Sequence, residues 1–325
     1  MSLAKIALLP DRGAVSVSGP DAEKLLQGLI TGDLAPLAHG RSYQTLPAVH
    51  AALLSPQGKI LFEMLVTRTL DRGREPGDAF VLETSRAEAP ALVDRLKKYK
   101  LRADVVIKDA SDMATVAALW GAGDAELASP IPIAFDASPM HCKDPRHPAL
   151  GLRWKVPELL LSSTGEQMRE RMIASALRSG KLEQVDVAEY HAHRIALGVP
   201  EAGKDYALGD AFPHEANFDL LNGVSFTKGC FIGQEVVSRM QHRGTARKRI
   251  VIVEADTPLP SGVEITAGAA TIGTVGSVAG NRGLALVRLD RAEEARAKGE
   301  PLMAGGTAVT VRLPDYMKAA AAATP

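Results

Sequence analysis

Apolar residues recur along the chain with two different spacings. Short alternating or continuous apolar runs predict strands at residues 6–9, 14–17, 44–54, 59–69, 79–83, 105–107 and 114–119. Helical spacing predicts one helix that begins at the cap Asp21 and another over residues 86–99. The order strand, helix, strand, strand, helix, strand is typical of an antiparallel sheet with helices on one face.

The second half has the same mixture of predicted strands and helices as the first, but no recognisable sequence repeat. Strands are predicted at residues 151–156 and 158–161, and helices at residues 167–179 and 187–197. From Arg249 onward, short strands are separated by glycine and proline turns, which predicts a small β-barrel or sandwich. The alanine-rich end, residues 317–325, is expected to fray or to form only a weak helix.

Composition narrows the class of protein. The chain has 325 residues, of which 46% are hydrophobic and 23% charged, as in a globular protein with a sizeable core. Its 38 basic and 38 acidic residues balance, so net charge does not indicate nucleic acid, a membrane or an acidic substrate. No apolar stretch approaches the roughly 20 residues of a membrane helix, and the N-terminus resembles neither a signal nor a transit peptide. We therefore expect a cytoplasmic protein.

The chain has two cysteines, Cys142 and Cys230. Two thiols exclude a disulfide framework and a four-thiolate zinc or iron–sulfur site within one chain. His141, Cys142 and His147 have only a loose metal-like spacing. His191 and His193 are two residues apart on a predicted helix and point in different directions. The sequence therefore predicts no metal site.

The densest group of reactive side chains lies between Phe226 and Gly244. Seven of them fall within sixteen residues: Lys228, Cys230, Gln234, Glu235, Arg239, His242 and Arg243. Gly229 and Gly233 flank the thiol, and we expect both to adopt backbone angles that a side chain would forbid. A helix is predicted to begin after Gly233 and to end at Gly244. A loop with this much reactive polarity is the strongest candidate site.

Each of these residues has a functional and a structural interpretation. A thiol beside an ammonium group near a helix N-terminus would have a lowered pKa and react as the thiolate. The alternative for Cys230, and the commoner outcome for a free cysteine, is a buried, inert side chain. His214 and His242 are candidate bases for it. Gln234 and Glu235 could hydrogen-bond a fused heterocycle such as a pterin, or Glu235 could cap the helix.

A basic cluster follows the candidate loop. Its members are Arg239, Arg243, Arg247, Lys248 and Arg249. The cluster could bind a carboxylate tail or a phosphate, although a solvated face is the commoner outcome for a charge run. Nucleic acid is a weaker interpretation, because no aromatic residues are interleaved with these charges.

The central run resembles a known signature. Residues 228–235 read Lys-Gly-Cys-Phe-Ile-Gly-Gln-Glu, similar to the Lys-Gly-Cys-aromatic-x-Gly-Gln-Glu signature of the YgfZ family, the folate-binding relatives of the glycine cleavage T-protein (aminomethyltransferase). The flanking residues 217–226 and 239–244 are also similar, especially to the branch that contains the mitochondrial iron–sulfur assembly factor. The likeness extends to residues 19–33, 55–61 and 194–200 in the expected order.

This resemblance implies an α+β fold with three domains in a T-protein-like ring around a tetrahydrofolate channel. Two intertwined ferredoxin-like α+β domains would be followed by a C-terminal small β-barrel. The expected boundaries are residues 1–120 with 200–245 for the first domain, 121–199 for the second, 246–316 for the barrel and 317–325 for a frayed tail.

The resemblance also implies tetrahydrofolate, or a derivative, as cofactor. Its binding residues would be Lys228, Gln234, Glu235, Arg243, Glu215 and Arg239, with Cys230 as the reactive thiol. The implied function is that of an accessory protein for assembly or maintenance of iron–sulfur clusters in client enzymes. The expected partners are those enzymes or other assembly factors, with no nucleic acid and no membrane, and a monomer is favoured.

The chain departs from the T-protein pattern at two places. An acidic pair of the aminomethyltransferases is replaced by Phe62-Glu63, and their Arg-x-Glu-x-Gly motif becomes Arg194-Ile-Ala-Leu-Gly198, without the acid. Because proton transfer at the folate would need these carboxylates, enzymatic activity stays open, with Glu63 and Glu215 as the remaining candidates. Two alternatives follow: a folate-dependent aminomethyl transferase, and a direct iron–sulfur cluster carrier that uses Cys230 with a partner.

Overall fold

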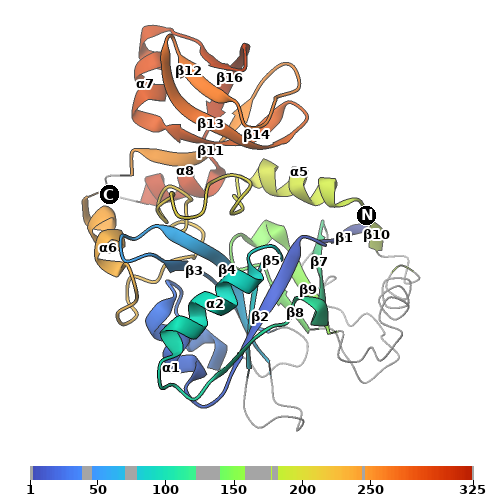
Figure 1. Cartoon of the computed structure of the whole chain (residues 1–325). Coiled ribbons are helices and arrows are strands. Elements are labelled where there is room, and N and C mark those ends of the chain that lie inside the picture. The colour runs from blue at the N-terminus through green and yellow to red at the C-terminus, as the bar shows by residue number, and fades with distance from the viewer. Residues whose placement is uncertain are drawn as a thin grey trace. The chain divides into compact units, whose positions relative to one another are not determined.

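The computed structural model of the chain describes residues 3–38, 46–69, 79–121, 140–157, 177, 182–243 and 246–323. The chain forms two compact units (Figure 1). Unit 1 comprises Met1–Ala51 and Phe62–Val187, and unit 2 comprises Ala52–Leu61 and Ala188–Pro325. The strand expected at 158–161 lies outside the described residues, as does all but one residue of the helix expected at 167–179. The three-domain boundaries remain a prediction.

Unit 1 contains two five-stranded sheets. The first has the order β10-β1-β7-β9-β8, in which β10 runs parallel to β1 and the other pairs are antiparallel. Its strands are β1 (Ala4–Leu8), β7 (Ala114–Trp120), β8 (Met140–Lys143), β9 (Leu152–Pro157) and β10 (Leu182–Gln184). Ile6, Leu119 and Trp154 form part of its buried core.

The second sheet has the order β3-β4-β5-β2-β6, and the turn between β3 and β4 belongs to unit 2. Its strands are β2 (Arg12–Ser18), β3 (Ala48–Leu54), β4 (Ile60–Thr69), β5 (Ala79–Ser85) and β6 (Val106–Asp109). Helix α2 (Ala89–Lys100) packs on β2 and β6, and α1 (Ala22–Leu29) contacts β5. Leu92, Val93 and Leu96 form the buried face of α2, as their spacing predicted. Short 3-10 helices occur at Ala35–Ala38, Ser111–Met113 and Pro148–Leu150.

A buried ionic cluster lies within unit 1. Its members are all at most 7% exposed: Arg12, His50, Glu63, Glu83, Asp144, Arg146 and Arg153. Asp144 accepts hydrogen bonds from Arg146 and Arg153 at 2.8 and 3.0 Å. Three guanidinium groups thus face three carboxylates, so that these buried charges compensate one another.

The barrel of unit 2 is closed, with the strand order β11-β14-β13-β12-β15-β16. Its strands are β11 (Lys248–Glu254), β12 (Glu264–Ala267), β13 (Ala270–Ala279), β14 (Arg282–Arg288), β15 (Leu302–Ala304) and β16 (Thr307–Arg312). The predicted C-terminal β-barrel is therefore confirmed. The pattern did not predict α7 (Leu289–Lys298), because only Ala295 is fully buried along it and no apolar stripe marks it.

Three further helices complete the described part of unit 2. They are α5 (Val187–Leu197), α6 (Gln234–Arg243) and α8 (Asp315–Ala323). The helices predicted at 187–197 and after Gly233 are confirmed. Residues 317–323, expected to fray, belong to α8, whose Tyr316 hydroxyl donates to the Gly198 carbonyl at 2.7 Å. This hydrogen bond anchors a segment whose composition predicted fraying or only a weak helix.

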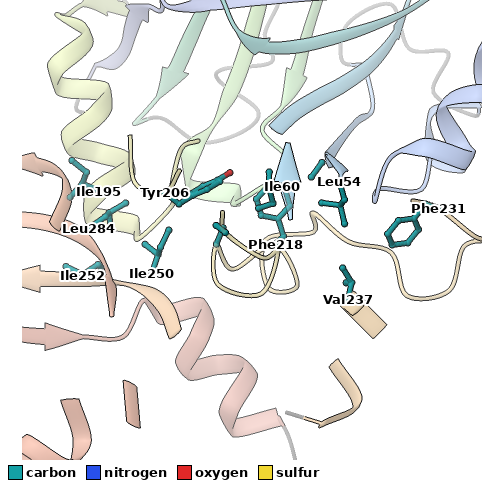
Figure 2. Close-up of a cluster of buried hydrophobic side chains, with 13 residues drawn as sticks. Leu54, Ile60, Ile195, Tyr206, Phe218, Phe231, Val237, Ile250, Ile252 and Leu284 are labelled. Carbon is teal, nitrogen blue, oxygen red and sulfur yellow. The ribbon is translucent and has the colours of Figure 1, made fainter. Parts of the chain in front are cut away.

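An apolar core joins the β3–β4 turn to the rest of unit 2 (Figure 2). Leu54 and Ile60, on either side of the turn, lie in the same cluster as Phe231 and Val237 (Figure 2). Burial of one such side chain contributes about 1.5–3 kcal/mol. The core therefore holds the segment that contains the candidate loop.

Candidate functional site

Cys230 is exposed, whereas the next residue, Phe231, is buried and holds the loop in the core. The Phe231 side chain is 7% exposed and lies in the core with Leu54 and Val237 (Figure 2). The other cysteine, Cys142, is buried in β8. Because ligation and nucleophilic attack both need an accessible sulfur, Cys230 is the thiol of the native protein that is open to chemistry.

Gly233 allows the β3–β4 turn to lie close to the start of α6. Its φ is +80°, and a Cβ there would come within 2.7 Å of the Ser55 carbonyl oxygen. Gly58, in the turn, also has φ +80°, and its Cβ would lie 2.9 Å from Cβ of Val236. The expected need for glycine is confirmed at Gly233 but wrong at Gly229, which has no positive φ and where a Cβ would meet no described atom within 4 Å.

Lys228 places its ammonium group over the ring of Phe231, the residue after Cys230. Its Nζ lies 5.6 Å from the centroid of the Phe231 ring, a cation–π contact. Its backbone N–H donates to the Ser225 hydroxyl at 3.2 Å. Both contacts fix the loop directly before Cys230.

The first turn of α6 contains Gln234 and Glu235. Gln234 is half-buried, whereas Glu235 is exposed. Arg239 Nη2 donates to Glu235 Oε1 at 2.8 Å, so this guanidinium and this carboxylate neutralise each other on the outer face of the helix. Arg243 is the last residue of α6, and its side chain lies outside the described part of the chain.

Glu215 has a structural partner. Its Oε2 accepts from the Phe212 N–H at 2.9 Å, and its carbonyl accepts from the Ile250 N–H at 3.0 Å. Of the two candidate bases, His242 is exposed on α6, whereas His214 is buried, with Nε2 3.0 Å from Gln241 Oε1. Both Glu215 and His214 thus have structural partners near the loop, and the cofactor-binding role of Glu215 remains a prediction.

Glu63, the remaining candidate acid, lies in the buried ionic cluster of unit 1. Its Oε1 is 3.3 Å from His50 Nε2 and 3.7 Å from Arg146 Nη1. Burial alone would raise its pKa, but the hydrogen bond and charge of His50, with the charges of Arg146 and Arg12, lower the pKa to about 2. A carboxylate held ionised in this way is a structural anion and a poor proton donor.

Sequence reasoning missed the role of Arg194. Its Nη1 lies 2.7 Å from Asp205 Oδ2, its Nε lies 3.3 Å from Glu201 Oε2, and its Nη2 donates to the Ser277 hydroxyl at 2.6 Å. Burial opposes the charge, but these two carboxylates raise the pKa of Arg194. The arginine thus connects α5 to β13 within unit 2. This network forms with alanine, not an acid, at position 196.

Among the described residues, no group of three His, Cys, Asp or Glu side chains could hold a metal ion. His147 Nδ1 accepts from the Ala149 N–H at 3.2 Å and closes a turn. None of the described helices has the length and hydropathy needed to cross a membrane.

Comparison with known proteins establishes the fold. Residues 247–319 match the family model of the CAF17 C-terminal beta-barrel domain. The glycine cleavage system aminomethyltransferase T from Bartonella henselae superposes with a TM-score of 0.73 over 97% of this chain and 86% of that chain, at 16% identity. The predicted α+β, T-protein-like fold is confirmed.

Curated relatives are more similar in sequence. The mitochondrial iron–sulfur cluster assembly factor IBA57 of Mus musculus is 33% identical over 290 residues, which cover 86% of this chain and 76% of that protein. The Homo sapiens protein of the same name is also 33% identical, with the same coverage. The homologue from Mycosarcoma maydis is 35% identical over 263 residues, and the match covers 80% of this chain but only 60% of the longer fungal protein.

These relatives correct one expectation and confirm another. All three are mitochondrial by name, which contradicts the expected cytoplasmic location. The family resemblance predicted from residues 228–235 is confirmed, and the similarity extends over most of the chain. On this identity and coverage, the chain belongs to the IBA57 family.

Proposed function

We propose that this protein is an iron–sulfur cluster assembly factor in which Cys230 is the functional thiol. The relatives carry that function in their names, and Cys230 is exposed while Cys142 is buried. The proposal depends on the exposure of this sulfur, because a cluster, or a partner that holds one, can then reach it. Its partners would be iron–sulfur client enzymes or other assembly factors.

The loop suits a thiol that must meet a partner. Phe231 and Gly233 anchor its C-terminal side, and the ammonium group of Lys228 lies over the ring of Phe231, the residue after Cys230. A thiolate is the form that ligates iron. Direct carriage, with Cys230 as one ligand of a cluster shared with a partner, is the most specific version of the proposal.

The test is complementation of cells that lack their own factor, with the activity of iron–sulfur enzymes in the lysate as readout. Cys230→Ala should fold and fail to complement, whereas Cys142→Ala should complement if it folds. Full activity of Cys230→Ala would refute the assignment. For the carriage version, anaerobic reconstitution with iron and sulfide should give sulfur-to-iron charge-transfer absorbance that Cys230→Ala lacks.

We also propose that the protein binds tetrahydrofolate, as its resemblance to the folate-binding relatives implies. The donor set fits in part. The amide of Gln234 and the ammonium of Lys228 suit a pterin and an anionic tail, whereas Arg239 is paired with Glu235. When bound, the cofactor would supply a carrier for one-carbon units.

Calorimetric titration with tetrahydrofolate tests this second proposal. Gln234→Leu should weaken binding about tenfold or more, because one hydrogen-bonding group that would face the ligand is lost. Glu235→Gln, on the exposed face, is the matched control. Aminomethyl transfer is the alternative activity, and absence of any folate product with the purified protein would count against it. The ion pairs of Glu63 already weaken that alternative.

A further inference from the structure

A single buried imidazole touches both ends of the segment that contains Cys230. His214 is 2% exposed. Its ring centroid lies 6.1 Å from that of Phe226, four residues before the thiol. Its Nε2 lies 3.0 Å from Oε1 of Gln241, eleven residues after the thiol and on α6. One side chain therefore connects the entry of the loop to the helix that follows it.

The backbone of His214 is itself held in place. Its carbonyl accepts from Arg249 Nη1 at 2.8 Å. That guanidinium also donates to both carboxylate oxygens of Asp219, at 2.6 and 2.8 Å. Arg249 belongs to β11, so the imidazole projects from a turn that is tied to the barrel. Because the backbone of His214 is held in place, its ring can restrain the side chains that it contacts.

The hydrogen bonds of the ring show which contact the histidine serves. Gln241 Oε1 is an acceptor, so Nε2 carries the hydrogen in this arrangement. Nδ1 is buried and has no hydrogen-bond partner among the described residues. A buried polar atom without a partner is destabilising, and an apolar side chain would avoid that penalty. The imidazole is therefore explained by its bond to Gln241 and its contact with Phe226.

We infer that His214 is the positioning residue of the Cys230 loop. Phe231 anchors the C-terminal side of the loop in the core, and His214 anchors the N-terminal side through Phe226. Between these anchors, Gly229 and Cys230 are exposed. With both sides held, the sulfur is presented in one orientation. The use of that orientation in cluster assembly rests on the proposed function, whereas the order of the loop does not.

A spin label on Cys230 measures the order of the loop directly. Because Cys142 is buried, a methanethiosulfonate nitroxide should label Cys230 selectively in the native protein. In His214→Ala, the spectrum of the label should narrow, with a several-fold shorter rotational correlation time. Amide hydrogen exchange over residues 227–230 should become about tenfold faster, as expected from the loss of one hydrogen bond.

Three further variants separate positioning from general stability. Gln241→Leu removes the acceptor from the protein surface and should loosen the label even if His214→Ala fails to fold. His214→Gln can still donate to Gln241 and should restore part of the order. His242→Ala, exposed on the same helix, should leave the spectrum unchanged.

A wild-type spectrum in folded His214→Ala or in Gln241→Leu would overturn the inference. The proposed function fails separately, if Cys230→Ala complements fully. In that case the spectra of the labelled variants still decide whether His214 positions the loop.

Discussion

The buried ionic cluster of unit 1 and the Cys230 loop with α6 in unit 2 use charged side chains in opposite ways. In unit 1, the buried ionic cluster pairs its arginines and carboxylates with one another, all nearly inaccessible to solvent. In unit 2, the Cys230 loop and α6 expose their reactive groups, and the ion pair between Glu235 and Arg239 lies on the surface. The difference teaches that residue type alone does not identify a site. Exposure separates the structural carboxylate of Glu63 from the accessible thiol of Cys230.

The largest effect is expected from breaking the cluster at Asp144. Asp144→Asn removes the anion that faces Arg146 and Arg153 and leaves two buried guanidinium groups undercompensated. The free energy of unfolding should fall by about 3–5 kcal/mol. Urea unfolding followed by circular dichroism measures this loss.

The matched control for this variant is Asp112→Asn. Asp112 also pairs with an arginine, Arg86, at 2.9 Å, but its side chain is 99% exposed. Its replacement should change the free energy of unfolding by less than about 1 kcal/mol. Equal losses in the two variants would contradict the distinction between buried and exposed pairs.

Acid should destabilise the protein through the same cluster. The pKa of Glu63 is lowered to about 2 from its usual 4.5. A carboxyl group with a lowered pKa in the folded state contributes stability above the unfolded value, and this contribution is lost as the pH falls from about 4.5 towards 2. The loss should reach roughly 3 kcal/mol. The pKa of Asp144 is lowered as well, so it acts in the same direction.

Urea unfolding at a series of pH values from 7 to about 2.5 measures this dependence. Glu63→Gln removes one titrating group, so its stability should decline less steeply below about pH 4.5 than that of the wild type. Identical slopes for the two proteins would show that Glu63 does not contribute to acid sensitivity.

The two glycines of the loop should respond differently to alanine. At Gly233, alanine meets both an unfavourable φ of +80° and the Ser55 carbonyl, so we expect a loss of about 1–3 kcal/mol. At Gly229, a Cβ meets no described atom within 4 Å, and the loss should be under about 0.5 kcal/mol. Thermal unfolding of both variants makes the comparison, and a larger loss at Gly229 would reverse the assignment.

Local patterns predicted the elements of the site better than its contacts. The helix after Gly233, the barrel strands and the T-protein-like fold followed from periodicity, turn residues and a resemblance, and the i, i+4 pair of Glu235 and Arg239 was within reach of a spacing rule. The ion pairs of Glu63 could not be predicted from any local spacing rule. The cluster includes Arg12 and Glu83, 71 residues apart, and only sheet pairing brings such residues together. The contact of Gly233 with the β3–β4 turn is equally non-local.

The smallest effect is expected at the surface ion pair, and it completes the comparison with the buried cluster. A double-mutant cycle of Glu235→Ala and Arg239→Ala should give a coupling free energy of about 0.3–0.5 kcal/mol, because water screens both charges and two long side chains must be ordered. The coupling should shrink further in 1 M salt, where charges are screened beyond about 3 Å. A coupling above roughly 1.5 kcal/mol would mean that the pair is desolvated. Weak coupling instead would let either group exchange its partner for a charged ligand at the exposed surface of α6.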